Sequence, residues 1–397
     1  MTKKHVIESV IFLTYALFAF SWVAGSMLSK NIMADFQVQG VAAATWSTNA
    51  ITIAKVIGNL IAAWFLAQLQ PKKAFALASL LIVAGIAGVW AGSYPVYVFT
   101  RLVMGFGGAF VIVYFGPIVM NYFTPEERPL INGINSIAFN TGNLLALLFT
   151  GVLLSHLGSW QSVIMTISAC SLVLLVIWLA VAEDFPLGNK AQQDQPAAKP
   201  YTLKDGLKDS FNWILPLCYS GILFAYISIF ALFPLLPSFA VPARNLSALM
   251  ITAGMVGTFA GIVATKKYPF RVPLIRYSGL VMTLFIALMI LTGNPILAYI
   301  AAFAAGFFMF LPMTAMMTLP QELPGMTPGR VTVVFGMFWS IAYIVETIWM
   351  YAAGLLADKT GNPMMAALFV LVCSASAFLA SFFLPETGKP KQLVPEK

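Results

Sequence analysis

Long apolar segments dominate this 397-residue chain and restrict its fold more than any other feature. The hydrocarbon core of a bilayer is about 30 Å thick, so a helix needs roughly 20 apolar residues to cross it. Charged residues make up only 9% of the chain, against about 25% in a globular domain. We therefore expect an all-α membrane protein, and not a soluble enzyme. Its twelve candidate transmembrane helices have approximate limits 7–29, 43–68, 74–93, 95–122, 129–154, 161–182, 211–236, 245–266, 273–292, 295–319, 331–356 and 363–384.

A polar stretch at residues 183–210 divides these segments six and six. Its centre reads QQDQPAA and is flanked by alternating charges, a composition typical of a solvated linker. We expect an N-terminal six-helix bundle at 1–182, a cytoplasmic linker at 183–210 and a C-terminal six-helix bundle at 211–397. No segment outside the membrane is long enough for a catalytic domain, so we do not expect an enzyme.

Lysine and arginine are distributed unevenly among the connections between the segments. With the N-terminus inside, 17 of the 22 basic residues lie in cytoplasmic segments, and three lie outside (Lys30, Arg244 and Lys359). Cytoplasmic loops of membrane proteins carry this excess of positive charge. We predict a multi-pass protein of the bacterial inner membrane with both termini in the cytoplasm.

The two halves of the chain resemble each other at an offset of 203 residues. The matched positions cluster in or beside the fifth and eleventh segments, and they are Thr124-Pro125 with Thr327-Pro328, Gly133 with Gly336, Gly151 with Gly354, and Gly158 with Gly361. Parallel repeats about an axis along the membrane normal are typical of rocking-type secondary transporters. The repeat therefore predicts two bundles related by pseudo-two-fold symmetry.

Three short motifs resemble those of the major facilitator superfamily of secondary transporters. Residues 101–109, RLVMGFGGA, are similar to the family's fourth-helix motif, an arginine followed by spaced glycines. Residues 121–128, NYFTPEER, resemble its link from helix 4 to helix 5, and residues 157–161, LGSWQ, resemble its next link. Residues 328–361 are distantly similar to its cyanate- and nitrate-type permeases. The resemblance covers essentially the whole chain and implies the twelve-helix fold of that family.

Two departures from the family pattern affect the expected mechanism. The signature between helices 2 and 3 is reduced to QLQPKK at residues 68–73 and lacks its acidic residue, so a latch of the usual kind is not expected. Proton-antiporting exporters carry a glycine series in helix 5 that ends in Gly-Pro and Gly-Gly. This chain has Gly133 and Gly142, but then Ala146-Leu147 and Thr150-Gly151. The incomplete antiporter signature favours uptake.

Three charged residues, Lys55, Arg101 and Glu346, lie well inside predicted helices. A charge near the bilayer centre costs at least about 2.5–3.5 kcal/mol, so each needs a reason to be there. At about 1.5 Å per residue, Lys55 and Glu346 both fall near mid-membrane depth, and the family resemblance places their helices where the two bundles face each other. We expect them to form an ion pair that protonation of Glu346 releases. The alternative is a permanent pair that only fixes the packing.

Two further charges allow a functional and a structural interpretation. The Arg101 guanidinium either binds an anion or carboxylate, or tunes a proton-carrying group, or donates to backbone carbonyls at a glycine-rich helix crossing. The resemblance places helix 4 on the central cavity and favours a functional role. Glu8, at the end of helix 1, is either solvated or involved in coupling.

Polar and aromatic residues recur at helical spacing on helices 1, 5, 7 and 11. We expect them to line the solute pathway, with interhelical packing as the alternative. Together with the three intramembrane charges, the predicted substrate and coupling residues are Lys55, Arg101, Glu346, Asn140, Asn143, Tyr343, Trp339, Tyr15, Tyr219 and Tyr226.

These features favour a secondary transporter that takes up a small organic or inorganic anion together with protons, because two intramembrane cations accompany one central acid. The alternative is a proton-antiporting exporter of amphiphilic drugs or metabolites that uses Glu346 as its proton carrier. A receptor or scaffold is disfavoured because it needs no central charges. An ATP-driven pump is excluded, since no GxxxxGK[ST] loop occurs.

The expected partners are a small-molecule substrate, protons and the lipid bilayer, and the chain is expected to act as a monomer. No cofactor or metal is expected, because the three cysteines lie in apolar runs and the two histidines, His5 and His156, are far apart. The net charge of +8 comes from scattered loop residues, so no nucleic-acid partner is expected.

Overall fold

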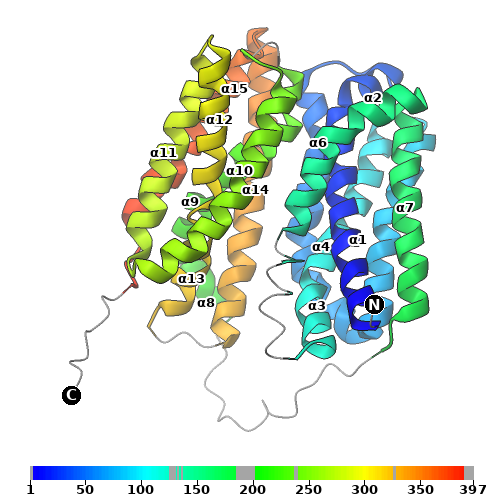
Figure 1. Cartoon of the computed structure of the whole chain (residues 1–397), viewed down its shortest axis with the longest axis horizontal. Helices are drawn as coiled ribbons and strands as arrows, with labels where there is room; N and C mark the ends of the chain where they lie inside the picture. Colours follow the sequence, from blue (N-terminus) through cyan, green and yellow to red (C-terminus); the bar gives the residue numbers. More distant parts are fainter. Residues whose placement is uncertain are drawn as a thin grey trace. The chain divides into compact units, whose positions relative to one another are not determined.

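The computed structural model describes residues 3–124, 131, 134, 135, 137–184, 202–236, 240–324 and 328–388. Over these ranges the chain is helical, with short turns and no β-strand. Its long helices are coloured along the sequence in Figure 1. They are α1 (Lys3–Met27), α3 (Val41–Val83), α4 (Tyr94–Tyr122), α6 (Ala138–Leu157), α7 (Trp160–Val181), α9 (Phe211–Ala231), α10 (Ala243–Lys267), α11 (Arg271–Leu291), α12 (Pro295–Phe310), α14 (Pro328–Thr360) and α15 (Met364–Ser374).

Shorter elements connect or extend these helices. They are α2 (Ser29–Asp35), α8 (Leu203–Lys208), α13 (Met313–Thr318), α16 (Ser376–Leu379) and the 3₁₀ turns at Ala84–Trp90, Phe233–Leu235, Leu319–Glu322 and Ala380–Phe383. Eleven helical segments of the described chain are long and apolar enough to cross a membrane. The predicted segment 43–68 is helical as the first part of α3. The prediction of an all-helical membrane fold is confirmed.

Proline separates helical segments at two places. The second and third predicted segments lie within α3 as two helices that meet at a kink at Gln70 (φ 63°, ψ 160°) directly before Pro71, because a proline disfavours the helical conformation in the residue that precedes it. The predicted helix 295–319 is broken between α12 and α13, where Pro312 cannot donate a backbone hydrogen bond.

A carboxylate from another part of the chain binds the backbone just after the kink in α3. Asp184, which follows α7, accepts a hydrogen bond from the Lys72 backbone N–H at 3.0 Å. The indole N–H of Trp178 donates to the Lys72 carbonyl at 2.9 Å. Residues 68–73 lack the acidic residue of the family signature, and Asp184 supplies a carboxylate to the same connection from a different helix end.

The chain divides into two compact units. The first comprises Met1–Pro196, Phe230–Leu235 and Met350–Gly361, and the second comprises Ala197–Ile229, Leu236–Trp349 and Asn362–Lys397. The end of α14 therefore groups with the first unit. Residues 185–201 of the predicted linker lie outside the described ranges, and the boundary at 183–210 stays a prediction.

Glycine residues set the distances between helices within the first unit, where α3 packs on α4 and α1 packs on α6. A Cβ on Gly105 would lie 2.7 Å from the Cβ of Ala54, and one on Gly142 would lie 2.0 Å from the Ala16 carbonyl oxygen. Both distances are shorter than any real carbon contact, so the helices approach this closely only because those side chains are absent. The spaced glycines of α4 thus serve packing.

The N-terminus of α3 is capped by a side chain from the end of α14. Asp358 accepts hydrogen bonds from the backbone N–H groups of Val41 at 2.7 Å and Ala42 at 2.9 Å. The preceding Gly40 has φ +99°, a conformation that L side chains rarely adopt. A carboxylate at this position satisfies free N–H groups and interacts favourably with the helix dipole. All of these residues belong to the first unit.

Removing this cap should lower stability. We expect Asp358→Ala to reduce the free energy of unfolding by about 0.5–2 kcal/mol, the usual cost of losing an N-terminal cap. The thermal unfolding midpoint of the purified protein in detergent measures it. Lys359→Ala, at the adjacent exposed position, is the control. Equal midpoints for the two variants would show that the cap does not stabilise the fold.

Candidate functional site

Lys55 of α3 is buried in the first unit against aromatic rings. Its side chain is only 3% exposed. The ammonium nitrogen lies 4.8 Å from the ring centroid of Phe139, 5.1 Å from that of Trp22 and 5.8 Å from that of Phe18. Ring faces attract cations, and the attraction is stronger where water is excluded. The surroundings of Lys55 thus stabilise a positive charge inside an apolar bundle.

The rings around Lys55 belong to a larger aromatic cluster, which we define as Tyr15, Phe18, Trp22, Phe115 and Phe139. Tyr15 stacks on Phe18 at a centroid distance of 5.8 Å and meets Phe115 edge-on at 5.4 Å. It also contacts Phe139 at 5.6 Å. The structure therefore brings together two residues that the sequence predicted separately, Lys55 and Tyr15. Phe18 and Phe139 were missed, because nothing distinguishes them among 32 phenylalanines.

Arg101 of α4 is 2% exposed and binds the backbone of α1. Its guanidinium donates to the Ser21 carbonyl at 3.0 Å and to the Trp22 carbonyl at 2.8 Å. This geometry matches the helix-crossing interpretation given above, while the predicted anion contact stays a prediction. Since Trp22 lies over Lys55, Arg101 also holds one wall of the aromatic cluster in place.

Gly25 makes room for this guanidinium and gives a test of its role. A Cβ on Gly25 would lie 2.7 Å from the Arg101 Cζ. Gly25→Ala should therefore displace Arg101 and lower the free energy of unfolding by about 1–3 kcal/mol, as measured by thermal unfolding. Gly116→Ala in α4, where nothing lies within 4 Å, is the matched control and should be neutral or stabilising. A stable Gly25→Ala protein would mean that Arg101 is free to move.

Polar side chains extend the site along α3 and α6. Asn140 and Asn143 of α6 are buried, as are Thr48 and Thr52 on the helix face of Lys55. The Thr48 hydroxyl lies 3.1 Å from that of Ser26 in α1. These polar residues thus face the interior of the first unit. Asn132 and Ser136 precede Asn140 at helical spacing in the sequence, and both lie outside the described residues.

Glu8 of α1 is also inside the first unit. Its side chain is only 7% exposed, and Asn135 is buried in the same unit. The interpretation of Glu8 as a solvated residue at a helix end is therefore wrong. Glu8 adds a buried acid to the two buried cations of this unit.

The second unit holds the other predicted residues on α9 and α14. Glu346 is fully buried, and Trp339, Tyr343 and Glu346 share a face of α14 by their spacing. Tyr219 of α9 meets Trp339 edge-on at 5.4 Å, and Trp339 stacks on Tyr343 at 6.4 Å. Tyr226 packs elsewhere, against Phe310 at 5.1 Å.

Lys55 and Glu346 lie in different units, so the ion pair predicted between them stays a prediction. Among the described residues, no group of three or more His, Cys, Asp and Glu is placed to hold a metal ion.

Many long apolar helices with buried charges and closely packed crossings define an integral, multi-pass membrane protein. The profile of the Major Facilitator Superfamily matches residues 10–347, and the chain belongs to that family. Its members are transporters of small molecules and not enzymes.

Several relatives and solved structures are similar to this chain. It is 25% identical to the "Probable sulfoacetate transporter SauU" of Cupriavidus necator over 82% of this chain and 81% of that protein. It is 27% identical to an uncharacterised protein of Campylobacter jejuni over 58% and 70%. A bacterial Spinster homologue has the same fold, with a TM-score of 0.77 at 16% identity over 97% and 98% of the two chains. A D-xylose–proton symporter gives 0.72 at 16% identity over 98% of both.

Proposed function

We propose that this transporter takes up a small organic anion together with protons by alternating access. The observation that carries the proposal is the Lys55 ammonium, which is buried in the aromatic cluster of the first unit. Asn140 and Asn143 are buried in the same unit. A charge in that position is costly, and binding an anionic group there offsets part of the cost. Arg101 holds the backbone of Trp22, one residue of the aromatic cluster, in position. The side-chain amides of Asn140 and Asn143 supply hydrogen-bond donors for the oxygen atoms of the anion.

The comparisons support an anionic substrate. SauU is named for sulfoacetate, a small molecule with one carboxylate and one sulfonate group. Both groups are oxyanions that accept hydrogen bonds from ammonium and amide donors. The solved symporters of similar fold are named for the proton-coupled transport of xylose and fucose. Their names support proton coupling as the energy source.

We assign the coupling proton to Glu346. It is a fully buried acid in the second unit, next to the aromatic face of Trp339 and Tyr343 on α14. Burial of the ionised carboxylate in such surroundings costs free energy, whereas burial of the neutral, protonated acid costs much less. The protonation state of Glu346 therefore changes the relative stability of conformations that bury it and conformations that expose it. The same aromatic face beside an acid favours a second candidate function, proton-driven export of an amphiphilic solute. We also propose that both termini lie in the cytoplasm and that the chain acts as a monomer.

Reconstituted proteoliposomes with an imposed pH gradient test the proposal. With the acidic side outside, we expect radiolabelled sulfoacetate or a related small carboxylate to accumulate inside, and the accumulation to disappear when a protonophore collapses the gradient. A gradient-driven loss of a hydrophobic cation or dye from the vesicles would instead support export. Absence of anion uptake for the whole set of small carboxylates and sulfonates would overturn the proposal.

A further inference from the structure

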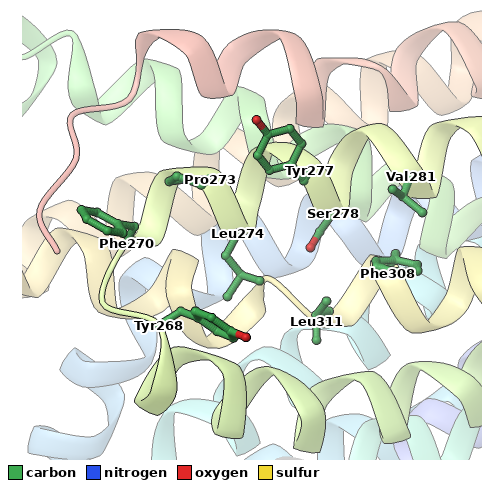
Figure 2. A pocket seen from close by; sticks show the side chains of 9 residues that line it. All are labelled: Tyr268, Phe270, Pro273, Leu274, Tyr277, Ser278, Val281, Phe308 and Leu311. Atoms are coloured by element: carbon green, nitrogen blue, oxygen red, sulfur yellow. The ribbon is translucent and has the colours of Figure 1, made fainter. Parts of the chain in front are cut away.

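An elongated apolar groove lies on the second unit where α10 ends and α11 begins. It has a volume of about 290 Å³, and its walls include Tyr268, Phe270, Leu274, Val281, Phe308 and Leu311. Figure 2 shows Leu274 of α11 pointing toward the space that Tyr268 and Leu311 border from the opposite side. Its lining residues follow α11 from Pro273 to Val281, about 12 Å of helix. The groove thus runs along a membrane-spanning helix.

Close backbone contacts fix the base of this groove. A Cβ on Gly257 would lie 2.2 Å from the Phe307 carbonyl oxygen, and one on Gly261 would lie 2.2 Å from that of Leu311. Helices α10 and α12 therefore touch through their backbones beside the groove, and α11 packs on α12. Because the main chains are already in contact, the groove cannot close by moving α10 towards α12.

The groove is surrounded by surface suited to lipid. Tyr277 is 62% exposed, and Tyr268 and Phe270 are exposed too. Tyrosine rings are typical of the boundary between the hydrocarbon core and the headgroup layer, because they combine an apolar body with a polar tip. An acyl chain lying in the groove would therefore leave it next to the headgroup layer.

Basic residues gather at the same end of the helices. Lys266 and Lys267 are exposed in the last turn of α10, and the Lys267 ammonium lies 5.8 Å from the ring centroid of Tyr268. Arg271 is held by Glu322 through bonds of 2.8 and 3.1 Å. That interaction lowers the pKa of Glu322, which stays ionised.

Two other charged groups near the groove, Arg276 and Glu386, are also engaged by the protein. Arg276 stacks on Phe382, with its guanidinium carbon 4.1 Å from the ring centroid. Glu386 accepts the backbone N–H groups of Arg271 and Val272. Lys266 and Lys267, in contrast, are exposed at the end of α10.

We propose that this groove binds one acyl chain of an anionic phospholipid whose phosphate contacts Lys266 and Lys267. An acyl chain is apolar and extended, and it fits a groove that has apolar walls, runs along α11 and ends at aromatic rings. The positively charged lysine pair suits a headgroup with net negative charge. This site is separate from the residues proposed for transport.

Native mass spectrometry of the full-length protein in detergent tests this site with phosphatidylglycerol and phosphatidylcholine. We expect phosphatidylglycerol to bind more tightly. The double variant Lys266→Gln/Lys267→Gln should weaken its binding about 30-fold, the effect of two basic residues near a membrane surface. Phosphatidylcholine binding should weaken much less, because the choline cation neutralises the phosphate of that lipid. Leu274→Trp should fill the groove and weaken both lipids. Lys72→Gln/Lys73→Gln, a lysine pair at the kink of α3, is the matched control.

Three results would overturn the proposal. Equal affinities for the two lipids would show that the net charge of the headgroup does not contribute to binding. Unchanged phosphatidylglycerol binding by the Lys266→Gln/Lys267→Gln protein would place the headgroup elsewhere. Unchanged binding by a folded Leu274→Trp protein, checked by thermal unfolding, would place the acyl chain elsewhere. None of these outcomes depends on transport activity.

Discussion

Proteoliposomes that contain the Lys55→Met protein should take up the labelled anion at least about 30-fold more slowly than those with the unchanged protein. Removing one member of a buried, desolvated charge interaction costs about 2–5 kcal/mol, which corresponds to a factor of 30 or more in affinity. Methionine preserves the apolar contacts with the rings of the aromatic cluster, so the loss should come from the charge alone. The measurement is the initial uptake rate over a range of anion concentrations.

Two controls separate substrate binding from folding. Lys204→Gln removes an exposed lysine on α8 and should leave uptake unchanged. Thermal unfolding of Lys55→Met in detergent checks that the variant is folded, because methionine keeps the apolar contacts with the rings. Normal uptake by a well-folded Lys55→Met protein would show that Lys55 does not bind the substrate.

The second large effect is expected for Glu346→Gln, which should abolish accumulation without abolishing exchange. For one proton moved with each singly charged anion, a gradient of one pH unit supports about tenfold accumulation, since one unit corresponds to about 1.36 kcal/mol. A neutral glutamine mimics the protonated acid permanently, so the gradient no longer drives net movement. Steady-state accumulation should fall to a ratio of about one, while exchange of labelled for unlabelled anion continues.

Asp205→Asn, which neutralises an exposed acid on α8, is the control for the loss of one negative charge. Full retention of proton-driven accumulation by Glu346→Gln would contradict the coupling role and favour a packing role for this residue. Loss of both accumulation and exchange would assign Glu346 to substrate binding and not to the proton.

The fold was largely predictable because lipid imposes a simple rule on the sequence. Each helix must be long, apolar and self-sufficient in backbone hydrogen bonds, so segments such as 161–182 and 211–236 stand out from composition alone. Helix breaks at prolines were harder to predict, because membrane helices tolerate Pro216 in α9 while α12 ends just before Pro312. What differs is the packing of neighbouring helices, which one sequence does not reveal.

The candidate site was predictable mainly through its charges, and Tyr15, Asn140 and Asn143 were found through helical spacing. Lys55, Arg101 and Glu346 were found because a charge inside an apolar segment is conspicuous. The rings of Phe18 and Phe139, which surround Lys55, are ordinary apolar residues by sequence and become part of a site only through the packing of α1 against α6. The hydrogen-bond partners of Arg101 are backbone carbonyls, which every residue has, so the sequence does not indicate which ones it binds.

The cap on α3 has a consequence for how the protein is made. Asp358 lies 317 residues beyond Val41, the residue whose N–H group it accepts. At a synthesis rate of about 5–20 residues per second, the start of α3 waits roughly 15 to 60 s for the side chain that completes it. The N-terminal part of the chain thus enters the membrane with one helix end unfinished. This part of the protein therefore acquires its final set of bonds only after Asp358 has been synthesised.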